Sequence, residues 1–227
     1  PSGLPYNPIS TLWSDSSMKR RFVFLPTPNS QIVYSDLGSW QFPVGTVIIK
    51  EFFIYSDLAD PTSPVIPLET RFLVRKSSTD WETYSYQWNT EGTDAILREE
   101  SFETEEITTF NVTNSLNPQQ TTYEHIFPSR SQCFQCHQGT ANEKALGLNT
   151  FQLNNWYQQS ESIENQIAYL QRHQLLDGAP ISSKDISPPI PSPFNSSQTL
   201  QKRVKSYLEG NCAHCHNSTL HFTCGDH

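Results

Sequence analysis

Two short stretches of this chain carry the same arrangement of cysteine and histidine. Residues 133–137 read CFQCH and residues 212–216 read CAHCH, so each stretch is a C-x-x-C-H. Two thiols at this spacing can add to the two vinyl groups of one haem, while the adjoining histidine binds the iron. The pattern therefore predicts two covalent haem c groups. The predicted thioether bonds lie at Cys133, Cys136, Cys212 and Cys215, and the predicted proximal iron ligands are His137 and His216.

A four-cysteine zinc site and a thioredoxin-type redox pair also use C-x-x-C. Zinc ribbons usually separate their two pairs by roughly 15 to 20 residues, whereas the whole of residues 137–211 separates them here. A thioredoxin-type pair would sit between a strand and a helix of a βαβ unit, and no such unit is visible around Cys133. Neither alternative accounts for a histidine after both pairs, so haem attachment is the favoured interpretation.

The two motifs leave the sixth ligand of each iron open. Met18 is the only methionine, so thioether ligation of both irons is excluded and histidine is the better candidate. The histidines beyond the proximal pair are His125, His173, His214, His221 and His227. Of these, the candidate distal ligands are His125, His173 and His221, and a surface or core position is the alternative for each.

Basic residues are candidate partners of the haem propionates. Arg130 precedes Cys133 by three residues, and a guanidinium binds a carboxylate through two parallel hydrogen bonds. We therefore predict that Arg130 contacts a propionate of the first haem, with a surface arginine as the alternative. The dense basic run at residues 19–21 is either a solvated turn or a propionate clamp or docking spot.

Composition narrows the classes of partner and the compartment. The chain has 227 residues and a net charge of −8, which argues against nucleic acid and anionic membranes. It has no apolar run of about 18 residues, which would indicate a transmembrane segment, and no leader opens it. Because haem attachment of this type takes place outside the cytoplasm, we expect a mature periplasmic or extracellular chain. The fifth cysteine, Cys224, is expected to be a free thiol, an intermolecular link or a result of truncation.

The segment from Phe22 to about Phe127 has the pattern of β-strands. Its short runs are rich in aromatic and β-branched residues, and Pro, Gly, Asp and Asn interrupt them at intervals of about 8 to 12 residues. The expected strands are 21–25, 31–34, 44–55, 70–75, 82–88, 94–97 and 105–112. Since no helical crossovers separate them, we predict an antiparallel sandwich or barrel-like domain over residues 1–127.

Helical periodicity begins after the first motif and predicts a second region over residues 128–227. Residues 160–176 place Ile163 and Ile167 on one stripe, which predicts a helix. A second predicted helix, between Ser197 and Gly210, leads into the second motif. A proline- and serine-rich linker, about residues 179–196, separates the two helices. We therefore expect an α+β chain in which a small helical, cytochrome c-like region holds both haems.

Six segments carry a resemblance to a known family. In order along the chain they are LWSD at 12–15, FPVGTV at 42–47, ETRFLVR at 69–75, YSYQWN at 84–89, PSRSQCFQCH at 128–137 and GNCAHCH at 210–216. With them the chain resembles, over nearly its whole length, a family of bacterial secreted di-haem c-type cytochromes. The resemblance implies a β-rich amino-terminal region, two haems and electron transfer, and no particular substrate. Only residues 217–227 follow the second motif, where a full cytochrome c domain would continue with further helices.

Three classes of function are open at this point. Electron transfer between two iron oxidation states is favoured. A di-haem peroxidase-like oxidoreductase with one open iron site is the alternative, and a structural or sensing module is the third. The expected partner is a redox protein or other copies of the chain. A neighbouring copy that covers the second haem would build a filament with a continuous haem path, whereas burial within one chain would not.

Overall fold

The computed structural model describes residues 3–98, 104–137, 144–159, 162–180 and 185–216. His221 and Cys224 lie outside these residues, so their predicted roles stay predictions. Within the described residues, strands dominate and a few short helices accompany them, which makes the chain an α+β protein with mostly antiparallel sheet. No helix in this part of the chain has both the length and the apolar composition that crossing a bilayer needs.

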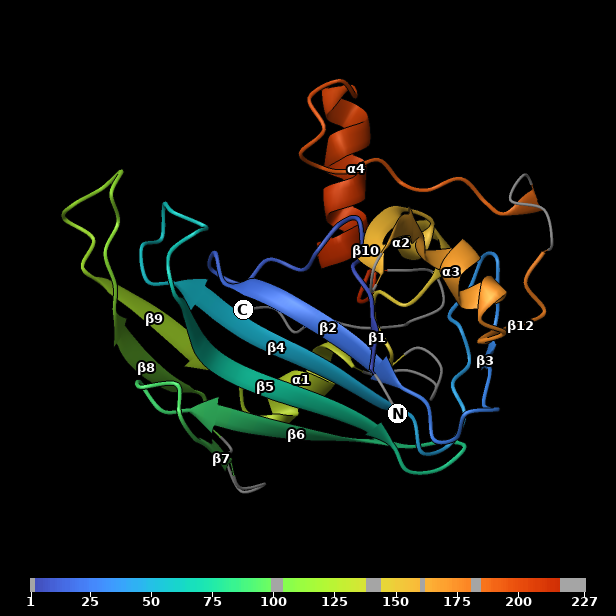
Figure 1. Cartoon of the computed structure of the whole chain (residues 1–227), viewed down its shortest axis with the longest axis horizontal. Coiled ribbons are helices and arrows are strands. Elements are labelled where there is room, and N and C mark those ends of the chain that lie inside the picture. Colours follow the sequence, from blue (N-terminus) through green and yellow to red (C-terminus); the bar gives the residue numbers. More distant parts are fainter. Residues whose placement is uncertain (1–2, 99–103, 138–143, 160–161, 181–184, 217–227) are drawn as a thin grey trace.

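A six-stranded antiparallel sheet is the framework of the fold (Figure 1). In spatial order its strands are β1 (Leu4–Pro5), β2 (Met18–Phe24), β4 (Val47–Tyr55), β5 (Val65–Arg75), β6 (Trp81–Trp88) and β7 (Ala95–Leu97). Every neighbouring pair is antiparallel, as the strand pattern predicts. Aromatic and β-branched side chains fill these strands because they pack well on a pleated surface.

Shorter elements surround the sheet. The paired strands are β8 (Glu106–Asn111) with β9 (Thr122–Phe127), β10 (Trp156–Gln159) with β11 (Ser162–Asn165), and the parallel pair β3 (Ile32–Val33) with β12 (Leu176–Asp177). The helices are α1 (Arg130–Cys136), α2 (Thr150–Leu153), α3 (Gln166–Arg172) and α4 (Leu200–Asn211). The two cysteines of the first C-x-x-C-H therefore lie on the first helix and His137 ends it, whereas the periodicity predicts helices only after this motif.

The prediction of one helix over residues 160–176 is wrong in its first part. This stretch forms strand β11 and only then helix α3. Asn165 sets the boundary, because its side-chain oxygen accepts hydrogen bonds from the backbone N–H groups of Ile167 and Ala168 at 3.0 and 3.2 Å. The helical stripe required Ile163 on the buried side, yet it is 66% exposed, whereas Ile167 is buried.

The predicted helix before the second motif is confirmed as α4, with a different cap. Thr199 begins the helix by accepting a hydrogen bond from the backbone N–H of Lys202. Ser197, the predicted cap, instead donates to the side-chain oxygen of Asn195 at 2.7 Å. The helix therefore starts two residues later than predicted, because local turn bonds occupy the earlier serine.

One face of the main sheet is organised in rows that run across the strands. Strand pairing sets Val23, Ile48 and Leu73 opposite one another, and these three are buried in the larger apolar core. The next row lies two residues further along each strand, and it consists of Arg21, Lys50 and Arg71. Because side chains alternate between the faces of a strand, both rows point to the same side. The inner face of the sheet thus changes from apolar to strongly basic between one row and the next.

Different segments cover the two ends of this inner face (Figure 1). At one end, the larger core joins the sheet to residues such as Leu148, Leu153 and Ile167, so this core includes residues from both sides of position 128. At the other end, hairpin β8–β9 packs over a second core that includes Phe52 and Phe110. The basic row lies between these two apolar cores.

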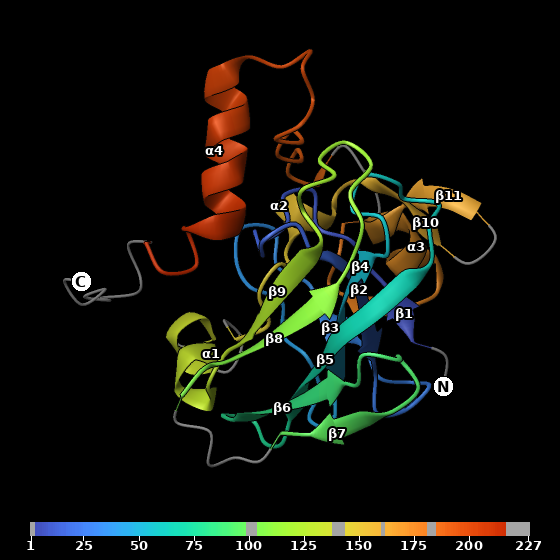
Figure 2. The ribbon, with the colours of Figure 1, turned by 90° about the vertical axis from the view of Figure 1, so that its left-hand side faces the viewer.

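Helix α4 is attached to the amino-terminal segment. Figure 2 shows α4 standing apart from the main sheet. The backbone N–H of Trp13 donates to the side-chain oxygen of Asn211 at 2.6 Å. A Cβ on Gly210 would lie 2.5 Å from the backbone oxygen of Ser10, so only glycine allows this approach. These contacts fix the end of α4 and hence the position of the second motif.

Candidate functional site

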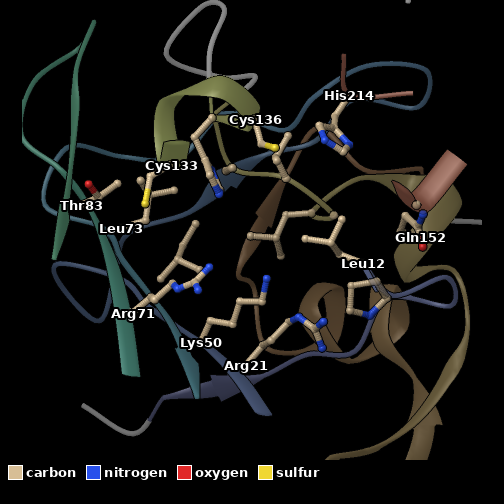
Figure 3. A pocket seen from close by; sticks show the side chains of 18 of the residues that line it. Leu12, Arg21, Lys50, Arg71, Leu73, Thr83, Cys133, Cys136, Gln152 and His214 are labelled. Atoms are coloured by element: carbon tan, nitrogen blue, oxygen red, sulfur yellow. The ribbon is translucent and has the colours of Figure 1, made fainter. Parts of the chain in front are cut away.

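A cavity of about 950 Å³ lies between the basic row, helix α1 and the second motif (Figure 3). This volume is at the upper end of the range for small-molecule and cofactor sites, about 300–1,000 Å³. Apolar side chains such as Leu12, Ile48 and Leu73 form part of its wall. Residues of both motifs line it as well. The cavity therefore brings together two segments that lie far apart in the sequence.

Helix α1 places the first motif in the wall of the cavity. Ser129 caps the helix, and a reciprocal bond from its backbone N–H to the Gln132 side chain at 2.8 Å completes a capping box. Cys133 and Cys136 are three positions apart, so they share one side of the helix, and both line the cavity. Burial raises the pKa of the Cys133 thiol. The local sequence S-x-x-Q thus starts the helix. The three-residue spacing of the cysteines then places both thiols on the side that faces the cavity.

His137 follows directly and has one ring nitrogen fixed. Its Nδ1 lies 2.6 Å from the backbone oxygen of Lys144. A carbonyl only accepts, so Nδ1 carries the proton and Nε2 keeps its lone pair. Burial lowers the pKa of His137 to about 4, so the imidazole is neutral near pH 7. Metal-binding histidines commonly donate their other ring N–H to a carbonyl in this way, so His137 has the form of a metal ligand.

The second motif reaches the same cavity through an unexpected residue. His214, at the third position of the motif, lines the cavity together with Ala213, whereas the predicted iron ligand His216 is exposed. The ligand atoms of Cys136, His214 and Cys215 lie within 4.8 Å of one another. The fold therefore places side chains of the two C-x-x-C-H motifs beside each other.

The basic row forms the floor of the cavity (Figure 3). The labelled side chains of Arg21, Lys50 and Arg71 extend from neighbouring strands into the space below the two cysteines. Burial, and then the charges of Arg21 and Arg71, hold the pKa of Lys50 well below its usual value. Burial likewise lowers the pKa of Arg21. Arg21 belongs to the basic run 19–21 that is conspicuous in the sequence, whereas Lys50 and Arg71 do not stand out there. The available signal was a basic residue within an otherwise largely apolar strand, because side chains at alternate positions of a strand share one face.

A buried acid neutralises one member of this row. Glu69 is fully buried on β5, and both of its carboxylate oxygens accept hydrogen bonds from Arg71, at 2.7 and 2.8 Å. His125 and Ser85 also contact this carboxylate, at 2.9 and 2.6 Å. Burial alone would raise the pKa of Glu69, but the Arg71 charge and these hydrogen bonds outweigh it and lower the pKa to about 2.

Two of the residues proposed as distal iron ligands, His125 and His173, lie away from the cavity. His125 is buried between strand β5 and Phe127, and its Nε2 contacts Glu69 rather than the cavity. His173 is exposed at the end of α3, with its ring against Tyr169 at a centroid distance of 4.4 Å. Neither lines the cavity. Arg130, the predicted propionate partner, does line it, and its guanidinium lies 5.9 Å from the ring centre of Phe134.

The residues of the cavity fit a haem at the first motif. A haem is an apolar disc with two carboxylates. The cavity offers a partly apolar wall, paired thiols beside a neutral histidine, and on its floor the buried Arg21 with the half-buried Lys50 and Arg71. In the second motif, Ala213 and His214 line the cavity, Cys215 lies beside Cys136, and His216 is exposed.

Comparisons of the chain with protein-family models, with curated proteins and with solved structures gave no match.

Proposed function

We propose that this chain is a di-haem c-type cytochrome that transfers electrons outside the cytoplasm. The observation that carries the proposal is the convergence of both C-x-x-C-H motifs on one large cavity with a partly apolar wall and a basic floor. When bound, haem supplies a one-electron iron centre whose potential depends on its axial ligands, its exposure and nearby charge. The resemblance of six sequence segments to secreted di-haem cytochromes points the same way.

In this proposal the protein residues bind and orient the two haems. Cys133 and Cys136 form the thioethers of the first haem, and the carbonyl of Lys144 holds His137 with Nε2 available for iron. Cys212, Cys215 and His216 serve the second haem. The segment from α1 to α4 acts as the small cytochrome c-like region, packed on the β-rich part. The redox partner is another protein or further copies of the chain.

Metal binding by thiolates is a second candidate function, supported by one observation. Cys136, His214 and Cys215 lie close enough to share one metal ion. Thiolate and imidazole are the ligands of structural zinc sites. A zinc site would hold the two motifs together, but it would bring no anion to Arg21 and Lys50 on the cavity floor.

Covalent haem content distinguishes the two candidates. The chain should be produced in a periplasm with a cytochrome c maturation system and measured by denaturing mass spectrometry, pyridine haemochrome absorption and metal analysis. We expect two covalent haems per chain, one after Cys133→Ala/Cys136→Ala, and one after Cys212→Ala/Cys215→Ala. A Cys224→Ala variant is the matched control and should keep both. A colourless protein with one bound zinc would establish the metal site instead.

The visible spectrum and particle size test the remaining parts of the proposal. Two low-spin irons support electron transfer, whereas one stable high-spin iron that binds cyanide would support a peroxidase-like enzyme. Light scattering and electron microscopy of the haem-loaded protein show whether copies assemble. A monodisperse monomer with two six-coordinate irons would exclude the filament.

A further inference from the structure

The two cations Arg21 and Lys50 form no ion pair with an acidic side chain within the described residues. Arg21 is only 6% exposed, and no side-chain hydrogen bond or ion pair of either residue is found in this part of the chain. The contact that Lys50 does make is with an aromatic ring, because its Nζ lies 4.9 Å from the ring centre of Phe52. Both side chains face the cavity.

Their neighbour Arg71 differs from them because its charge is balanced inside the protein. Glu69 accepts two hydrogen bonds from Arg71 and carries one negative charge. The other arginine on this part of the wall with a known acidic partner is Arg98, which lies 3.2 Å from Glu106. Among the described residues of the cavity floor, Arg21 and Lys50 therefore remain without an ion-pair partner of their own.

Enclosed charges of the same sign are costly unless an anion accompanies them. Removing a charge from water costs several kcal/mol, and neighbouring like charges add to this. Strand pairing forces Arg21 and Lys50 to stand side by side on β2 and β4. Apolar side chains would pack at these positions without that cost, as Val23 and Ile48 do in the next row. The arrangement is consistent with a ligand that brings two negative charges into the cavity.

We propose that Arg21 and Lys50 bind the two propionate carboxylates of the haem attached to Cys133 and Cys136. This inference rests on the proposed function and extends it. It places the propionate edge of that haem against two residues of the sheet, in addition to the contact predicted for Arg130. The thiols of α1 lie on one side of the cavity and the two cations on the other (Figure 3). A haem, whose vinyl-derived edge and carboxylate edge lie on different parts of the ring, matches this separation.

The reduction potential of the first haem tests this assignment. A positive charge near the porphyrin favours the reduced iron, which carries one positive charge fewer. We expect Arg21→Gln and Lys50→Gln each to shift the reduction equilibrium of one haem roughly tenfold towards the oxidised form. The charge-conserving variants Arg21→Lys and Lys50→Arg should show little of this shift and keep the potential close to that of the unsubstituted protein. Potentials are measured by spectroelectrochemistry on the haem-loaded chain, and the Cys212→Ala/Cys215→Ala variant assigns the shift to the first haem.

Arg20→Gln is the matched control. Arg20 lies next to Arg21 on β2, but it is exposed and pairs loosely with Glu51 at 3.9 Å. Its removal takes away the same charge and should leave both potentials nearly unchanged. If either glutamine variant fails to fold, the other one and the two charge-conserving variants still measure the effect.

Three results would overturn the assignment in different ways. Full haem content with potentials equal to those of Arg20→Gln would overturn the propionate contact and leave the proposed function intact. A chain without covalent haem would overturn both. A potential that follows the concentration of added phosphate in the unsubstituted protein would show that a free anion, rather than a propionate, occupies the two cations.

Discussion

Glu69 and Arg71 lie two residues apart on strand β5 and form a bidentate ion pair on the inner face of the sheet, with N–O distances of 2.7 and 2.8 Å. The pair lies at the junction between the cavity and the core beneath hairpin β8–β9, where His125 also contacts the carboxylate. Its position explains why Arg71 has an ion-pair partner, whereas Arg21 and Lys50 have none in the part of the chain that the structure describes.

Replacing Glu69 should destabilise the fold in a pH-dependent way. Its pKa is lowered from an ordinary value of 4.5 to about 2, so its carboxylate stabilises the folded state fully above pH 4.5. That stabilisation falls as the pH drops from 4.5 towards 2. We expect Glu69→Gln to lower the free energy of unfolding by about 3 kcal/mol at pH 7. Urea unfolding followed by circular dichroism, at pH values from 7 to 3, measures the difference.

Glu51→Gln is the control for this prediction. Glu51 lies on the adjacent strand β4, in an exposed pair with Arg20 at 3.9 Å. Exposed pairs of this kind contribute about 0–1 kcal/mol. A Glu69→Gln penalty that stays constant down to pH 3 would contradict the low pKa of Glu69.

Gly210→Ala should loosen the attachment of the second motif. The added Cβ would lie 2.5 Å from the backbone oxygen of buried Ser10, so α4 or the amino-terminal segment must move. Overpacking of this kind costs about 1–3 kcal/mol. Thermal unfolding and haem content at the second motif measure the effect, and Lys205→Ala on the exposed side of α4 is the control. Equal stability of the two variants would show that the contact with Ser10 is not close.

His214→Ala should change the spectrum of the haem-loaded protein. Among the described histidines outside the predicted proximal pair, His214 is the one that lines the cavity. We expect its loss to convert part of the low-spin iron to high-spin iron, as read from the visible spectrum. His173→Ala is the control, because His173 is exposed at the end of α3. An unchanged His214→Ala spectrum would leave another residue as the sixth ligand.

Ser129→Ala should destabilise the helix that carries the first motif. The serine accepts a hydrogen bond from the backbone N–H of Gln132 and is buried. Loss of a cap typically costs about 1 kcal/mol. Hydrogen exchange of the α1 backbone should rise, while exchange in α4 stays unchanged. Thr199→Ala, which removes the cap of α4, should show the opposite pattern.

The sequence alone determined the elements whose signals are local. Alternation of aromatic and β-branched residues predicted the antiparallel strands, and the spacing of Cys133 and Cys136 determined that both thiols share one side of any helix that carries them. The helix before Cys212 was also predictable from its periodicity. The helix over residues 160–176 was predicted too long, because Asn165 caps α3 there and the preceding residues pair as a hairpin.

Only the tertiary structure decided which residues share the cavity. Arg21, Lys50 and Arg71 come from three strands, and their neighbourhood depends on strand register, which no local pattern specifies. In the same way, the sequence proposed His125 as an iron ligand, but the packing of hairpin β8–β9 turns it towards Glu69. His214 reaches the cavity because α4 is fixed against Ser10. Long-range packing thus placed the charges and histidines, whereas the spacing of residues within each motif indicated the chemistry.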